Sequence, residues 1–267
     1  MTLSIGKAWE ETSAFLVREG RLVAPVALAL FALPSTLLNW AYPPGTTTNG
    51  SGIATLVLLL ILVAVMIGQM TIILLAIGWH GSIGEAIGKV ARRVPSLLGA
   101  ALIVYGPLLI MFSVALAALL VAAGIDNPAM VSPEDVVKVP GVFSLTILMF
   151  AVAAFFSIRL FPMSAVAANE QVRPIALLKR SWALSRGRFG RLLMALALLV
   201  IAALALSAAV STVVGSLATL LLGEPRSFNL SALIVALAGG IVAALISSVA
   251  AAMIGRLYVQ LSAEPAA

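Results

Sequence analysis

Cysteine is absent from this sequence of 267 residues, which has one histidine and few charges. The absence of cysteine excludes disulfides, thiolate catalysis and cysteine-ligated zinc. The single histidine, His80, cannot build a multi-histidine metal site, and no carboxylate cluster accompanies it. The sequence also lacks a Gly-x-Ser-x-Gly nucleophile motif and a Gly-Lys-Ser/Thr phosphate loop. We therefore expect no catalytic set, no metal and no cofactor.

Charged residues make up only 10% of the chain, whereas soluble domains contain about 25%. Apolar residues make up 62%, and the mean hydropathy is +1.16. A soluble core of this size cannot hide so much apolar surface, so lipid must surround it. The sequence therefore predicts an all-α, polytopic membrane protein with a single integral membrane domain, residues 1–267.

Six segments have the roughly 20 mostly apolar residues that a bilayer-spanning helix needs. They are residues 21–41, 53–79, 97–123, 142–168, 190–222 and 230–260. Three acidic residues interrupt the stretch before the first segment, so we expect no cleaved signal peptide there. Prolines inside spans lack a backbone donor and are expected to kink their helices: Pro25, Pro34, Pro107 and Pro162.

The loops between the spans differ sharply in charge. Two of them carry most of the basic residues: Lys89, Arg92 and Arg93 in one, and Arg173, Lys179, Arg180, Arg186, Arg188 and Arg191 in the other. The loop at 42–52 has no charge, and the loop at 124–141 is mainly acidic. Because basic loops remain in the cytoplasm, we expect both termini to be cytoplasmic.

Three segments have the spacing of short amphipathic helices that lie in the membrane interface. They are residues 3–18, 82–94 and 174–186. Their predicted apolar faces are Ile5, Trp9 and Leu16; Ile83, Ile87, Val90 and Val94; and Ile175, Leu178 and Trp182. The second segment is expected to present the opposite, charged face through Glu85, Lys89, Arg92 and Arg93.

These segments also suggest an internal repeat. Residues 4–9, Ser-Ile-Gly-Lys-Ala-Trp, resemble residues 82–87, Ser-Ile-Gly-Glu-Ala-Ile, and the segment from Pro174 has the same place in a third unit. Each segment precedes a pair of spans. We therefore predict three units of an interfacial helix and a membrane hairpin, at residues 1–79, 80–168 and 169–262.

The last span contains two stripes of small residues at four-residue spacing, which lets helix backbones approach closely in lipid. One stripe is Ala236, Gly240, Ala244, Ser248 and Ala252, and the other is Gly239, Ala243, Ser247, Ala251 and Gly255. The fifth span has a comparable stripe at Ala203, Ser207, Ser211 and Gly215. We interpret them as packing between the fifth and sixth spans, with contact between copies of the chain as the alternative.

Arg159 is the most unusual residue, because it lies inside the fourth span. It precedes Asn169-Glu170 by about ten residues, on the order of 15 Å along a helix. One interpretation is structural: the guanidinium reaches the interface or bonds to carbonyls freed near Pro162. The other is contact with an anion or lipid headgroup. Glu170 lies on the same predicted helix face, three turns farther along.

The run Ile158-Arg159-Leu160-Phe161-Pro162, followed by Ala167-Ala168-Asn169-Glu170 and the basic segment from Ile175 to Phe189, carries a resemblance. It resembles the bacterial glycerophosphodiester phosphodiesterase membrane-domain family, in which an arginine and a proline in a span precede a basic Ser-Trp segment. The resemblance implies a bacterial inner-membrane module. It does not imply phosphodiesterase activity, because the family's separate catalytic barrel, with its histidine pair, is missing here.

We expect a non-enzymatic membrane protein that binds lipid or supports transport or assembly. A small-solute or lipid transporter and, less favoured, a membrane enzyme acting on lipid phosphodiesters are the alternatives. Anionic membrane lipids are the expected partners; a protein partner or a second copy remains open, and nucleic acid is not expected. The residues expected to contact lipid are Arg159, Lys179, Arg180, Trp182, Arg186, Arg188 and Arg191.

Overall fold

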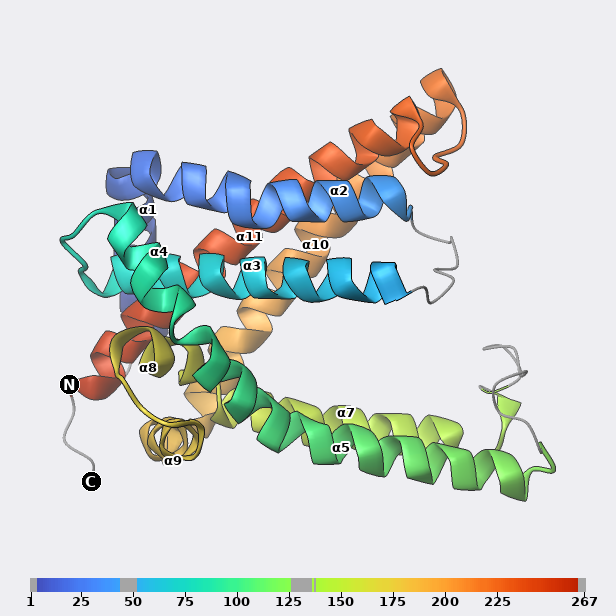
Figure 1. Cartoon of the computed structure of the whole chain (residues 1–267), viewed down its shortest axis with the longest axis horizontal. Helices are drawn as coiled ribbons and strands as arrows, with labels where there is room; N and C mark the ends of the chain where they lie inside the picture. Colours follow the sequence, from blue (N-terminus) through green and yellow to red (C-terminus); the bar gives the residue numbers. More distant parts are fainter. Residues whose placement is uncertain (1–3, 44–51, 126–135, 137, 264–267) are drawn as a thin grey trace.

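The chain is an all-α, multi-pass membrane protein with six membrane-spanning helical segments (Figure 1). A computed structural model describes residues 4–43, 52–125, 136 and 138–263. Its long helices are α1 (Ile5–Ala27), α3 (Gly52–Ile77), α5 (Val94–Ala122), α7 (Val142–Arg159), α10 (Phe189–Leu222) and α11 (Leu230–Ser262), and α2 (Leu33–Ala41) completes the first span. The short ones are η1 (Leu28–Ala32), α4 (Ile83–Ala91), α8 (Met163–Asn169) and α9 (Pro174–Ser185). The six predicted spans are thus confirmed, although most of the 124–141 loop lies outside the described residues.

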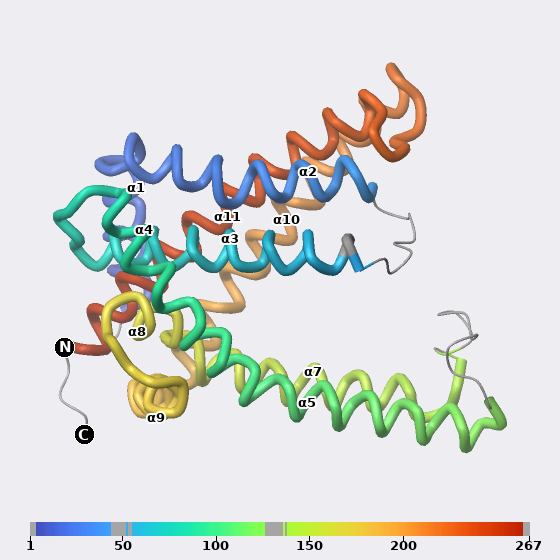
Figure 2. The backbone as a smooth tube through the Cα atoms, in the orientation of Figure 1, coloured from blue at the N-terminus to red at the C-terminus, as the bar shows by residue number. Residues whose placement is uncertain are grey.

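The short helices α4, α8 and α9 gather at one end of the molecule (Figures 1 and 2). Helix α1 also begins there and α11 ends there, and the Ser4 backbone N–H donates to Gln260 Oε1 at 3.3 Å. Among the described residues, the opposite end carries only Lys138 and Arg226 of all the lysines and arginines. The two ends of the helical bundle therefore differ strongly in charge.

The N-terminal amphipathic segment is not a separate helix. Helix α1 starts at Ile5 and continues through η1 into α2, so the helix predicted at 3–18 does not end there but is the first part of a longer one. This first part runs across the direction of the rest of the span (Figures 1 and 2), and its place in the membrane interface stays a prediction. Of its predicted apolar face, Trp9 is exposed and Ile5 and Leu16 are half-buried, while Ala8, Thr12 and Phe15 are buried in the protein. One π-helical turn, in which Leu33 donates to the Leu28 carbonyl, widens the helix just before Pro34. A wide turn relieves crowding between a proline ring and the carbonyl four residues earlier.

The fourth span is interrupted, as the proline inside it predicts. Helix α7 ends at Arg159, Pro162 is the N-cap of α8, and α8 ends at Asn169. Proline cannot donate the hydrogen bond that would continue α7, so the chain turns before entering α8. Arg159 and Glu170 therefore do not share one straight helix, and the predicted common face does not exist.

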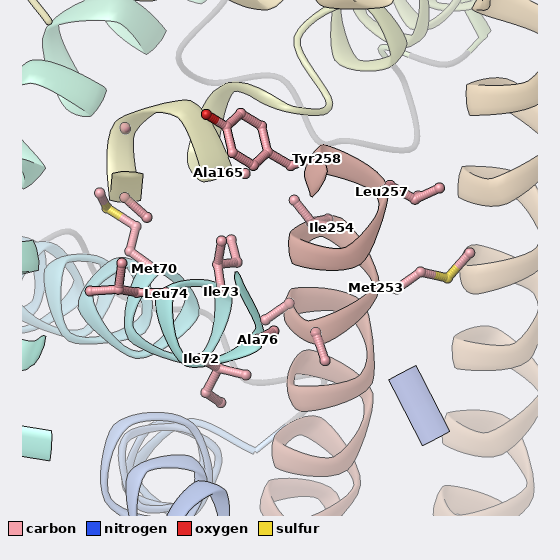
Figure 3. Close-up of a cluster of buried hydrophobic side chains, with 14 of the residues drawn as sticks. Met70, Ile72, Ile73, Leu74, Ala76, Ala165, Met253, Ile254, Leu257 and Tyr258 are labelled. Atoms are coloured by element: carbon pink, nitrogen blue, oxygen red, sulfur yellow. The ribbon is translucent and has the colours of Figure 1, made fainter. Parts of the chain in front are cut away.

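The tightest packing joins the first span, α3 and α11. Met70, Ile72, Ile73 and Leu74 of α3 are buried beside the end of α11 (Figure 3). The backbones approach closely: a methyl group placed on Gly255 would lie 3.1 Å from the Ile73 carbonyl oxygen. Such close approach maximises van der Waals contact, which drives helix association in lipid.

The small residues of α11 pack mainly against the first span and α3. The stripe from Ala236 through Gly240 and Ser248 to Ala252 is buried. A methyl group on Gly240 would collide with Thr36 Oγ1 and lie 2.8 Å from the Ala32 carbonyl oxygen, and Thr36 Oγ1 donates to the Ala236 carbonyl at 3.3 Å. In the other stripe Gly239 is exposed and Ala243 and Ser247 are half-buried. The expectation that these stripes pack on the fifth span is therefore wrong for Gly240.

Helices α10 and α11 form a hairpin but leave a groove of about 550 Å³ between them. Ser207 and Ser211 of the predicted α10 stripe line this groove together with Gly239 of α11. The rest of its lining is mainly leucine, valine, alanine and proline. The fifth and sixth spans do pack against each other, as predicted, but Ser207 and Ser211 of the α10 stripe border an apolar groove within that hairpin.

The second and third predicted repeat units each place a short helix before a hairpin: α4 before α5 and α7, and α9 before α10 and α11. Ser4 and Ser82, which start the matching sequence segments, are both N-caps whose hydroxyls accept from the backbone N–H three residues later. The third unit begins differently, with Pro174 following the N-cap Arg173. The three-unit repeat remains a prediction.

Candidate functional site

Helix α9 carries most of the basic Ser-Trp segment, and its boundaries match the predicted amphipathic helix. Its buried residues are Leu177, Ser181, Leu184 and Ser185. Of the predicted apolar face, Ile175 and Trp182 are exposed and Leu178 is half-buried, so this face is not the one that packs into the protein. In a membrane interface the exposed face can meet lipid, so an apolar side chain need not point into the protein.

A groove of about 880 Å³ runs along the exposed side of α9. Lys179, Trp182, Arg186 and Arg188 line it, together with Leu178, Ala183 and Gly187. Gly187 has φ +75°, a left-handed conformation that glycine adopts without strain, and it turns the chain out of α9 toward α10. The fold therefore brings together four of the seven residues predicted to contact lipid.

Arg159 does not line this groove, but it contacts the residues that shape it. Its Nη1 donates to the Ser185 carbonyl at 3.4 Å, at the end of α9. Its guanidinium carbon lies 5.0 Å from the centre of the Trp182 ring and 5.5 Å from that of Phe189. A cation over an aromatic face is attracted by the ring quadrupole. Arg159 thus joins the end of α7 to α9 rather than to carbonyls freed near Pro162.

Arg180 lies outside the groove and takes part in a separate polar network. Its Nε is 3.4 Å from Glu170 Oε1. Tyr258, which is 4% exposed, donates from its hydroxyl to the same oxygen at 2.8 Å and accepts from Asn169 Nδ2 at 3.3 Å. The network joins α8, α9 and α11. Arg191, the seventh predicted residue, is exposed in the first turn of α10 and does not line the groove.

The sequence predicts Arg93 on the charged face of the α4 segment, but the structure buries it: it is only 9% exposed. Its Nη1 donates to the Ala167 carbonyl at 3.3 Å and to the Ala168 carbonyl, near the end of α8. A cation favours the negative end of a helix. The signal was present, because Ala86, Val90, Arg93 and Leu97 recur at three- and four-residue spacing and all four are buried.

Burial lowers the pKa of the Arg93 guanidinium from its ordinary value. Partial burial also lowers the pKa of Lys89, and the positive charge of Arg93 adds to that shift. Lys89 Nζ lies 4.4 Å from the centre of the Trp79 ring, so an aromatic face rather than a carboxylate is its nearest stabilising contact. The α4 region therefore concentrates positive charge.

Within the described residues, no group of three or more His, Cys, Asp or Glu side chains is arranged to hold a metal ion. Both grooves at the short-helix end are lined by arginine and lysine, which suit anions; the α9 groove adds Trp182, and the groove beside α4 also contains Glu85 and Glu170.

The chain matches no protein-family model, no curated protein and no solved structure. The resemblance in residues 158–189 therefore stays a prediction, carried by the sequence motif alone.

Proposed function

We propose that this chain is a non-enzymatic protein of the bacterial inner membrane whose cytoplasmic side binds anionic lipid headgroups. The proposal rests on the α9 groove, which Lys179, Arg186 and Arg188 line together with the exposed Trp182. The residue set suits a lipid at the membrane surface, because cations attract its phosphate and an indole ring anchors at the headgroup level.

The charge asymmetry of the bundle supports the proposed orientation. The short-helix end carries nearly all the lysine and arginine side chains, and basic segments are retained on the cytoplasmic side. The α9 groove lies at that end. Anionic lipids give the cytoplasmic leaflet a negative surface potential, worth about 1 kcal/mol for each basic residue near it.

The exposure of individual side chains supports the same proposal. Trp182 is 39% exposed, and Ile175 on the same helix is more exposed. Neither Lys179 nor Arg186 forms an ion pair with another described residue. Two unpaired cations beside an exposed apolar surface fit a lipid that offers both phosphate and hydrocarbon.

We assign Arg159 a positioning role. It contacts the Trp182 ring and the last carbonyl of α9, and it is absent from the groove lining. It therefore holds the wall of the groove instead of touching the headgroup.

Transport is not proposed, because the groove between α10 and α11 is lined mainly by aliphatic and small side chains. A transport path for a polar solute would need polar groups reaching the middle of the membrane. A phosphodiesterase activity is not proposed either, since no acid–base pair converges in the α9 groove.

Native mass spectrometry of the purified protein tests the proposal. After delipidation, the protein is mixed with equal amounts of phosphatidylglycerol and phosphatidylcholine. We expect preferential retention of phosphatidylglycerol, and about tenfold weaker retention in the Lys179→Gln/Arg186→Gln variant. The control is Lys7→Gln/Arg18→Gln, which removes the same charge from exposed positions of α1.

Equal retention of the two lipids would refute the proposal, as would equal loss in both variants. The proposed orientation has its own test, helped by the absence of cysteine. A membrane-impermeant maleimide should label Ser227→Cys in intact cells from which the outer membrane has been removed. It should label Ser262→Cys only after the membrane is permeabilised. The reverse pattern would contradict the orientation.

A further inference from the structure

A second groove, of about 890 Å³, lies between α4 and the segment that joins α8 to α9. It does not share a lining residue with the α9 groove. Four basic residues line it: Lys89 and Arg92 from α4 and the turn after it, Arg93 before α5, and Arg173 at the start of α9. Helices far apart in sequence thus deliver positive charge to one place.

This positive charge is poorly neutralised. Within the described part of the chain, none of the four forms an ion pair with a carboxylate. The groove is also lined by Glu85 and Glu170, but Glu170 already pairs with Arg180 and accepts from Tyr258. An anion in the groove would offset the repulsion among the four cations.

Arg93 provides an independent sign of a ligand. It is more than nine-tenths buried and lines the groove, and its Nε has no hydrogen-bond partner among the described residues. The two carbonyls that accept from Nη1 supply only dipoles. Burying a full charge with dipoles alone is costly unless an opposite charge stands nearby.

The groove also has a rigid frame and an open wall. Ser96 Oγ donates to the Val172 carbonyl at 2.8 Å, and Arg93 fixes the end of α8 on the same side. Gly84 and Gly88, one helical turn apart on α4, both line the groove, and a methyl group added to either would meet no atom within 4 Å. Glycine at these positions leaves space for a ligand against the helix backbone.

We propose that this groove binds a phosphate-bearing anion. Lys89, Arg92, Arg93 and Arg173 supply the positive charge, and Gly84 and Gly88 leave the space. Guanidinium groups match phosphate oxygens with paired donors, and lysine adds a point charge. The phosphate belongs either to a lipid headgroup or to a soluble phosphate compound, and the two sources can be separated experimentally. This site is independent of the α9 groove and of the function proposed for it.

The test is calorimetric titration of the full-length protein in a nonionic detergent. The ligands are inorganic phosphate, dioctanoyl phosphatidic acid and, as a zwitterionic comparison, dioctanoyl phosphatidylcholine. We expect the wild type to bind at least one of the first two more tightly than phosphatidylcholine. The triple variant Lys89→Gln/Arg92→Gln/Arg173→Gln changes the three basic groove residues that are exposed or half-buried. We expect it to weaken binding on the order of a hundredfold. Arg93 is left intact because it also holds α8.

A steric variant gives a second measurement. Gly88→Leu fills the groove without removing a charge, and leucine suits a helix better than glycine, so α4 should remain folded. We expect it to reduce binding at least tenfold. Gly6→Leu is the matched control, because a side chain there also meets open space but lies on α1, away from the groove. Lys179→Gln/Arg186→Gln should bind normally, which separates this site from the α9 groove.

Binding of inorganic phosphate that both groove variants lose would support the site and identify a soluble source. Binding of phosphatidic acid without inorganic phosphate, lost in the same variants, would support it with a lipid source. The absence of both interactions, or affinities unchanged in the triple variant and in Gly88→Leu, would overturn the proposal.

Discussion

The α3–α11 core and the α5–α7 hairpin have similar hydropathy, but the core helices are packed against other helices and the hairpin is largely exposed. In the most apolar 18-residue stretch of α11, 33% of the residues are buried in the protein, whereas no residue of the most apolar stretch of α5 is buried. Figure 1 shows α5 and α7 side by side, diverging from the bundle that contains α3 and α11. Large side chains such as Leu102, Ile110 and Phe150 face outward on the hairpin.

The difference follows from the solvent. Lipid tails are as apolar as leucine, so exposing a leucine to lipid carries little penalty. Association depends instead on close contact, and α11 achieves it through Gly240 and Gly255, which allow backbone approach. The hairpin relies on fewer directed contacts, one being the Tyr105–Ser157 hydroxyl hydrogen bond at 3.0 Å. Hydropathy therefore predicts which segments span the membrane, and the positions of small residues indicate which side of a span packs against other helices.

The largest expected effect comes from filling the closest backbone contact. Gly240→Leu forces a side chain into Thr36 and the Ala32 carbonyl, so we expect a loss of about 3 kcal/mol in the free energy of unfolding in mixed micelles. Gly239→Leu, one residue away on the exposed groove side, should change it by less than about 0.5 kcal/mol. Similar destabilisation of both variants would break the distinction between the two faces of α11.

Truncating one isoleucine in each region compares them directly. Ile73→Ala removes a side chain that is 0% exposed, and we expect a loss of about 2 kcal/mol. This lies at the low end of the range for soluble cores, because lipid replaces water as the reference. Ile110→Ala on α5 removes a side chain that is 66% exposed and should be nearly neutral. Thermal unfolding in detergent measures both; a large cost at Ile110 would indicate that another subunit covers the hairpin.

The junction between the two regions can be weakened at one residue. Arg93→Met keeps much of the side-chain volume but leaves the carbonyls at the end of α8 without their donor, so we expect a loss of about 2 kcal/mol. Arg92→Met, at the exposed neighbouring position, is the control and should be within about 0.5 kcal/mol of the wild type. Guanidinium or heat denaturation in micelles gives the values. An equally stable Arg93→Met protein would show that α8 needs no cap.

The smallest expected effect concerns Arg159, which positions Trp182 in the wall of the α9 groove. Arg159→Lys keeps the charge but loses the planar group over Trp182, so we expect a loss of about 1 kcal/mol and a changed fluorescence emission from Trp182. The emission is measured in a background where the other three tryptophans are phenylalanine. Arg191→Lys, exposed on α10, is the comparison and should change neither quantity. If the fluorescence emission of Trp182 did not change in Arg159→Lys, the positioning role of Arg159 would be contradicted.

Much of the fold follows from the sequence, because span length and loop charge are local properties. All six spans and the short helices α4 and α9 were predicted, and the break at Pro162 follows from the missing donor of proline. The sequence does not predict that the segment at 3–18 and the first span form one continuous helix, because hydrophobic periodicity does not show where a helix ends. Two separate helices would require a break in the backbone hydrogen bonding, and no such break occurs between Ile5 and Ala41.

The candidate sites were harder to predict. The grouping of Lys179, Trp182, Arg186 and Arg188 follows from the sequence, because they are close together, on α9 and in the turn after it. The sequence places Arg180 with them, yet Arg180 pairs with Glu170, whose position depends on the turn at Pro162. The spacing of Arg93 with buried neighbours indicates its burial, but not its partners, because the carbonyls of Ala167 and Ala168 are more than 70 positions away in the sequence.

Composition and the order of charged loops were enough to establish helices in lipid, their number and the end where the cations gather. These properties arise from backbone hydrogen bonding and hydration, which act on each segment independently. Only the tertiary structure decided that Gly240 meets the first span, that Arg93 is buried and that Arg159 lies beside Trp182. In lipid every apolar face is acceptable to the solvent, so shape and a few distant polar contacts choose among the possible packings.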